Sequence, residues 1–122
     1  MPTKEFILIV DRDTGLRQLV SFTLQRQGYR VLEARTAEEG IRLFQDLGSD
    51  IKLLIADVAL GETSGTELAD RLIETRPDLL IVLTYSEQDR PAAQIEYPLL
   101  AKPFQPQELV SVVQAMMGDA AD

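Results

Sequence analysis

Apolar residues follow two alternating patterns along this chain. In five short segments they form nearly continuous runs, which is typical of strands that are covered on both faces of a parallel sheet. Between these runs, apolar residues recur at the spacing of one helix face. The alternation predicts an α/β fold, a doubly wound five-stranded parallel sheet flanked by helices. The expected strands cover residues 6–10, 29–33, 53–56, 79–83 and 99–101.

Start signals precede most of the helical stripes. Asp13 is placed to cap the first helix. Thr36 and Ser64 each stand three residues before a glutamate, which is the spacing of a capping box. Pro106 suits the first turn of the last helix. The stripes themselves are Leu16, Leu19, Val20 and Leu24; Ile41, Phe44 and Leu47; Leu68, Leu72 and Ile73; and Leu109, Val112, Val113 and Met116.

Two parts of the chain depart from this regularity. The second run, 29–33, is less apolar than the others, so we expect it near an edge of the sheet. The segment 85–98 has a proline near each end, and Ile95 is its only large aliphatic residue. The fourth helix is therefore expected to be short or irregular, from Pro91 to Ile95. Residues 119–122 are expected to form a frayed tail.

Composition limits the possible functions. The 122 residues are the length of a single domain, residues 1–122. The formal charge of −8 and the lack of a basic cluster argue against direct nucleic-acid binding. The chain has no cysteine and no histidine, which excludes disulfides, thiolate metal sites and Ser-His catalysis. It shows neither a signal peptide nor an apolar run of about 18 residues, so we expect a cytoplasmic protein without membrane contacts.

Four of the predicted strands are followed by a polar residue, namely Asp11, Asp57, Thr84 or Lys102. In parallel sheets the carboxyl ends of the strands meet at one edge, where ligands bind. A carboxylate there can accept a phosphoryl group as an acyl phosphate, and Asp57 is our candidate. Lys102 would neutralise one phosphate oxygen and Thr84 would donate to another. The expected cofactor is Mg²⁺, with Asp11, Asp57 and the backbone carbonyl of Ala59 as ligands.

Over nearly its whole length the chain resembles a response-regulator receiver domain, the phosphoaccepting half of two-component signalling. The matching stretches are 7–11, 57–60 followed by 64–67, 83–84 and 102–104. The resemblance implies strand order 2-1-3-4-5, with Asp57 as the phosphoacceptor and Asp11 as an acidic metal-site residue. It also makes Thr84 the switch hydroxyl and Lys102 the phosphate-binding lysine. The stretches 57–60 and 64–69, with the compressed fourth helix, are most similar to receivers of hybrid histidine kinases.

Several positions differ from the receiver pattern. Arg12 replaces the acid that normally ligates the metal directly, which should lower affinity for a divalent cation. Either Asp13 supplies the missing ligand, or Arg12 itself does part of the cation's work. Gly61 stands where a proline is common, and Leu99 stands where a switch aromatic is common. Tyr85 is a candidate substitute for that aromatic.

Three functions follow from these observations. The favoured one is a receiver that takes phosphate on Asp57 from a histidine kinase or phosphotransfer protein and signals to a downstream protein. The second is a phosphate-independent binding module whose metal site has decayed. The third is a haloacid-dehalogenase-like phosphatase using Asp11, suggested by the Asp11-Arg12-Asp13 stretch and by the acids of 119–122. Its expected threonine is one place early, as Thr14, and its last acids follow a helix.

The favoured function is not that of an enzyme, beyond self-phosphorylation from a phosphodonor and autodephosphorylation. The sequence names neither the kinase, the target nor the oligomeric state. It also leaves open whether the domain stands alone or is part of a longer chain.

Overall fold

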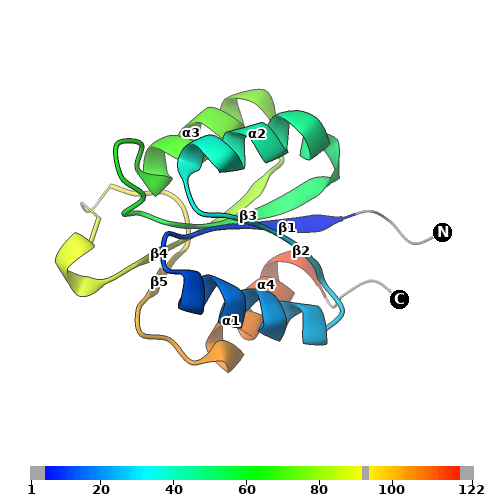
Figure 1. Ribbon diagram of the computed structural model, residues 1–122, viewed down its shortest axis with the longest axis vertical. Coiled ribbons are helices and arrows are strands. Elements are labelled where there is room, and N and C mark those ends of the chain that lie inside the picture. The colour runs from blue at the N-terminus through cyan, green and yellow to red at the C-terminus, as the bar shows by residue number, and fades with distance from the viewer. Residues whose placement is uncertain (1–4, 92–93, 119–122) are drawn as a thin grey trace.

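The strands form one parallel sheet in the order β2-β1-β3-β4-β5, as expected (Figure 1). This arrangement comes from a computed structural model that describes residues 5–91 and 94–118. The second run begins one residue later than expected and lies at an edge, in agreement with its more polar sequence. The strands are β1 (Phe6–Val10), β2 (Arg30–Ala34), β3 (Ile51–Asp57), β4 (Leu80–Tyr85) and β5 (Leu99–Ala101).

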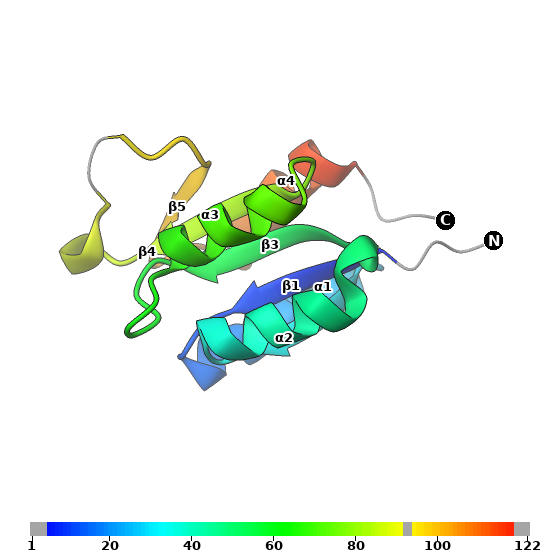
Figure 2. The same cartoon turned by 90° about the horizontal axis from the view of Figure 1, so that it is seen from above.

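Helices cover both faces of the sheet (Figures 1 and 2). One face carries α2 (Ala37–Leu47) and α3 (Gly65–Thr75), and the other carries α1 (Thr14–Arg26) and α4 (Pro106–Met117). A 3₁₀ turn, η1 (Gly48–Asp50), connects α2 to β3. Neighbouring strand residues enter opposite cores: Leu54 packs on the α2 and α3 side and Leu53 on the α1 and α4 side, both fully buried. This explains why the strand sequences are continuously apolar.

Side-chain caps mark the starts of α1 and α3. Asp13 Oδ1 accepts a hydrogen bond from Leu16 N at 3.1 Å, as expected for the cap of α1. At α3 the predicted capping box is complete, because Ser64 Oγ accepts from Glu67 N and Glu67 Oε1 accepts from Ser64 N. The last helix has Pro106 in its first turn. These caps place the first turns of α1 and α3 directly after β1 and after the loop that follows β3.

Two sequence predictions about helix faces and caps are wrong. Thr36 caps α2 by accepting from Glu39 N, but the Glu39 side chain accepts from Arg35 N instead of completing a box. Leu19 is 48% exposed rather than part of the buried stripe of α1. The buried face of α1 is turned because Arg17, only 8% exposed, takes a place on it.

The connection between β4 and β5 arches outward at the edge of the sheet (Figure 2). A 3₁₀ turn, η2 (Glu87–Asp89), follows β4. Neither Pro91 nor Ile95 is helical, so the predicted helix from Pro91 to Ile95 does not begin or end where the sequence indicated. Residues 92–93, between them, lie outside the described residues. Tyr97 packs against the core and donates its hydroxyl to Asp70 Oδ1 on α3 at 2.6 Å. The Tyr97–Asp70 hydrogen bond thus joins the segment where a helix was expected to α3.

Within the described ranges, no helix is both long and apolar enough to cross a membrane. The tail 119–122, which was expected to fray, lies outside these ranges.

Candidate functional site

Asp57 and Thr84 lie side by side at the ends of β3 and β4. They are register partners in the sheet, and Val58 N extends the ladder by donating to Thr84 O at 2.9 Å. Both side chains are buried, with residue exposures of 8% and 3%. The Thr84 hydroxyl donates to Asp57 Oδ1 at 3.2 Å. The sheet register therefore produces the hydroxyl–carboxylate pair that the sequence predicted.

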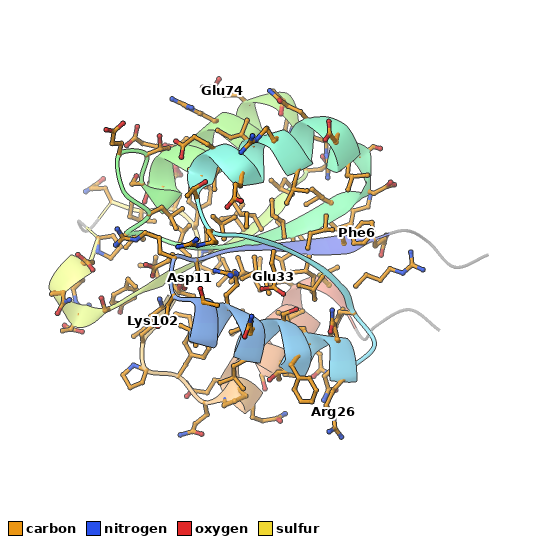
Figure 3. The ribbon with its side chains drawn as sticks, viewed as in Figure 1. Phe6, Asp11, Arg26, Glu33, Glu74 and Lys102 are labelled. Carbon is orange, nitrogen blue, oxygen red and sulfur yellow. The ribbon has the colours of Figure 1, made fainter. Side chains whose placement is uncertain are left out.

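Lys102 brings the two carboxylates together. It follows β5 directly, and its backbone N donates to Tyr85 O at 2.7 Å; the Lys102–Pro103 peptide bond is cis. Its Nζ lies 2.9 Å from Asp11 Oδ2 and 3.1 Å from Asp57 Oδ1. Figure 3 shows Lys102 beside Asp11, at the end of β1. All four residues at the predicted strand ends thus meet at one edge of the sheet.

The electrostatics of this cluster keep the lysine charged. Burial lowers the pKa of Lys102, but the hydrogen bonds and charges of Asp11 and Asp57 outweigh burial, and the pKa is raised. The ammonium is therefore present throughout the neutral range. A permanent cation between two carboxylates suits a site where negative charge arrives or develops.

Asp11 is held from three directions. Its Oδ1 accepts from Asp13 N at 2.8 Å, its Oδ2 faces Lys102, and its carbonyl accepts from Arg17 Nη1 at 2.9 Å. Arg17 Nε in turn lies 3.0 Å from Glu33 Oε1 on β2. Sequence reasoning missed Arg17. The sequence did contain a signal for it. Arg17 lies three residues before Val20 and seven before Leu24, a spacing that places it on the buried face of α1.

One oxygen of Asp57 is open. Oδ1 accepts from Thr84 and contacts Lys102, whereas no described residue donates to Oδ2. Among the described residues no buried side-chain oxygen lacks a partner, so Oδ2 retains contact with solvent. A fixed Oδ1 and an open Oδ2 give Asp57 a defined side from which it can react.

Gly65 is a further residue whose role the sequence did not reveal. It begins α3, and its N donates to Val58 O at 3.0 Å. A Cβ at this position would overlap the Asp57 carbonyl oxygen and lie 2.8 Å from the carbonyl carbon. The first turn of α3 therefore packs directly on the backbone of Asp57, at a distance that only glycine allows.

The residues that differ from the receiver pattern have distinct environments. Arg12 is exposed, and within the described ranges it has no hydrogen bond or ion pair. Gly61 has a φ of +109°, which proline cannot adopt. Leu99 is 41% exposed, while Tyr85 is buried, with the Arg90 guanidinium 5.3 Å from its ring. The role of Tyr85 as a substitute switch aromatic stays a prediction.

The donor set fits Mg²⁺ poorly. Mg²⁺ favours several oxygen ligands in octahedral geometry. Both oxygens of Asp11 already accept from protein donors, and Asp13, the candidate replacement ligand, uses its carboxylate to cap α1. In the described part of the chain, no group of three or more acidic, histidine or cysteine side chains could hold a metal ion. Arg12 stands where a further acid would be needed.

Comparison with known proteins identifies the class. The profile of the response regulator receiver domain matches residues 7–114, and the chain belongs to this family. A solved receiver domain protein from Clostridium thermocellum has the same fold, with a TM-score of 0.85, 23% identity and coverage of 93% of this chain and 94% of that one. The family acts in two-component signal transduction and not as conventional enzymes, which argues against the phosphatase alternative.

Two curated proteins illustrate its relatives. The chain is 37% identical over 116 residues to an uncharacterized 14.6 kDa protein in the sodA1 3′ region of Leptolyngbya boryana, covering 88% of this chain and 86% of that protein. It is 29% identical over 117 residues to the sensor kinase CckA of Brucella abortus, covering 91% of this chain but only 12% of CckA. The similarity to a sensor kinase agrees with the expected likeness to receivers of hybrid histidine kinases.

Proposed function

We propose that this receiver accepts a phosphoryl group on Asp57 from a histidine kinase or phosphotransfer protein and signals through protein–protein contacts. The observation that carries the proposal is the asymmetry of the Asp57 carboxylate. Thr84 and Lys102 hold Oδ1, and Oδ2 is open. The similarity to a sensor kinase supports a donor of this kind.

The residues present can carry the transfer. An electron pair of Asp57 Oδ2 attacks the phosphorus of a phosphohistidine, and a P–O bond forms as the P–N bond breaks. The electrons of that bond return to the imidazole nitrogen, which takes a proton from water. Lys102 stays beside the acceptor carboxylate and offsets the charge of the incoming oxygens. The Thr84 hydroxyl can turn from Asp57 Oδ1 to a phosphoryl oxygen, because the two groups are adjacent.

Intact mass spectrometry after incubation with acetyl phosphate and Mg²⁺ tests this function. Wild type is expected to gain one phosphoryl group, and Asp57→Asn is expected to gain none. Asp50→Asn, in the η1 turn at the opposite end of β3, is a matched control and should label like wild type. If wild type gains no phosphate while an ordinary receiver is labelled in parallel, the proposed function is wrong.

A phosphate-independent binding module is the second candidate, and the poor metal donor set favours it. This function predicts that the Asp57→Asn variant binds a protein partner as tightly as wild type does. If phosphorylation changes that affinity in wild type, the binding-module function is excluded.

A further inference from the structure

We infer that Asp57 is phosphorylated without a divalent cation, with Arg12 and Lys102 supplying the positive charge at the site. This inference rests on the proposed function and extends it to the chemistry that the site requires. It starts from the mismatch between the donor set and Mg²⁺.

The carboxylate oxygens are already occupied by protein donors. Of the four oxygens of Asp11 and Asp57, three face the Asp13 amide, the Thr84 hydroxyl or the Lys102 ammonium. Only Asp57 Oδ2 lacks such a donor within the described ranges. A dication held by both carboxylates would have to displace Lys102 or lie against it. Repulsion between these cations opposes metal binding, and the lysine is held there by its own charge contacts.

The local charge balance suits an anion better than a dication. Asp11 and Asp57 are offset by Lys102 and by Arg12, the neighbour of Asp11 in the chain. With Asp13 included, the three carboxylates and two cations sum to −1, and so small a local charge concentrates divalent cations weakly. The phosphoryl group is itself a dianion, and its arrival adds the negative charge that the two cations can neutralise.

Arg12 is available for this task. It lies in the turn between β1 and α1, exposed and without an ion pair in the described part of the chain. Its backbone is fixed on both sides, because Asp11 ends the strand ladder and Asp13 caps α1. A guanidinium presents a planar fork of donors that matches phosphate oxygens, and it remains charged at every accessible pH. An uncommitted arginine beside an acyl-phosphate site is thus a candidate ligand for the phosphoryl group.

The test measures the rate of labelling by acetyl phosphate, with intact mass as the readout, in Mg²⁺ and in excess EDTA. Wild type is expected to react at rates that agree within about threefold in the two conditions. Arg12→Ala should slow both reactions by about tenfold, as expected for the loss of one charge-assisted contact. Arg26→Ala removes an exposed arginine at the far end of α1 and should change neither rate. Arg12→Asp should react faster in Mg²⁺ than in EDTA.

A second measurement reads the metal directly. In an NMR titration of wild type with Mg²⁺ at millimolar concentration, the amide signals of residues 11–13 and 57–59 should not move, whereas those of Arg12→Asp should. If EDTA abolishes the labelling of wild type, or if wild type binds Mg²⁺ in this range, the inference is wrong and the proposed function stands. If wild type is labelled in neither condition, the proposed function fails and the inference fails with it.

Discussion

At the scale of single residues, Lys102 offsets the negative charges of the two carboxylates at the site. Asp11 and Asp57 are both nearly buried, and each contacts the same ammonium. Without that cation, two neighbouring carboxylates would repel each other in a poorly solvated place. The lysine therefore has a structural part of its own, and in the proposed reaction one of its carboxylate contacts would be exchanged for a phosphoryl oxygen.

Gly65 gives a prediction at the same scale. A methyl group there would overlap the Asp57 backbone, so Gly65→Ala must displace either the strand end or α3. We expect this variant to lose about 2 kcal/mol of unfolding free energy, a typical overpacking cost, and to label more slowly at Asp57. Urea unfolding and intact mass measure the two effects.

Gly15→Ala is the matched control. A Cβ there would meet its nearest neighbour, Asp13 Oδ1, at an ordinary 3.6 Å, and alanine favours a helix. This variant should be as stable as wild type or more so, and should label normally. A Gly65→Ala protein that behaves like Gly15→Ala would show that the close approach to Asp57 has no consequence.

The positions of site residues could be predicted from the sequence where those residues lie at the end of a strand. Asp11, Asp57, Thr84 and Lys102 could be grouped from sequence because each directly follows or ends an apolar run of a parallel sheet. The contribution of Gly65 could not, because it depends on how closely α3 approaches the backbone of β3.

At the scale of elements, the connection between β4 and β5 is the part of this fold that differs most from the expectation. Its described residues form the short turn η2 and then lie against the core through Ile95 and Tyr97. The Tyr97 hydroxyl reaches the carboxylate of Asp70 on α3, and burial together with that carboxylate raises the pKa of Tyr97 to about 12. This hydrogen bond links the connection to α3, the helix whose first residue, Gly65, packs on the Asp57 backbone.

Tyr97→Phe tests this link. The variant keeps the ring in the core and removes the hydrogen bond, so we expect a loss of about 1 kcal/mol in unfolding free energy. Hydrogen exchange should increase in the connection while remaining unchanged in β1 and β3. Asp70→Asn keeps an acceptor for the hydroxyl and should have the smaller effect. Equal exchange in Tyr97→Phe and wild type would mean that this hydrogen bond does not hold the segment.

Strands were easier to predict than this connection, for a physical reason. A buried parallel strand needs an apolar side chain on both faces, and that requirement is visible in the sequence. The segment between β4 and β5 has few apolar residues, so its path depends on contacts such as Tyr97–Asp70 that have no local signature. The face of α1 was misassigned for a similar reason, because Arg17 finds its partner, Glu33, on another element.

At the scale of the whole molecule, the sheet separates two hydrophobic cores, and the site lies at the sheet edge between them. The α2 and α3 side and the α1 and α4 side each bury one face of every central strand. The polar cluster lies at the strand ends, where the two cores meet the solvent. Changes in its charge should therefore be visible in the stability of the entire domain.

Alkaline pH provides the corresponding prediction. The pKa values of Lys102 and Tyr97 are raised in the folded state, so both groups bind their protons more tightly folded than unfolded. The stability that they contribute is complete below about pH 10, the unfolded values, and is lost as pH rises through the folded ones. Urea unfolding by circular dichroism should show the free energy of unfolding decreasing from about pH 10 to about pH 12.

The double variant Lys102→Met, Tyr97→Phe isolates these two groups. It should begin less stable at neutral pH, with about 3 kcal/mol of the loss arising from the unpaired carboxylates. Its stability should then fall less between pH 10 and pH 12 than that of wild type. A wild-type stability that rises over this interval would contradict the assignment.

The hydrogen bond between Tyr97 and Asp70 also means that the intrinsic fluorescence of the domain can report on this segment. The chain contains no tryptophan and three tyrosines, so its intrinsic fluorescence comes from those three rings. Tyr85 directly follows Thr84, and Tyr97 donates to a carboxylate on α3, whose first residue, Gly65, packs on the Asp57 backbone. A phenol bound to a carboxylate emits differently from one that faces water. Rearrangement of this segment after phosphorylation would therefore be recorded as a change in emission from the unlabelled protein.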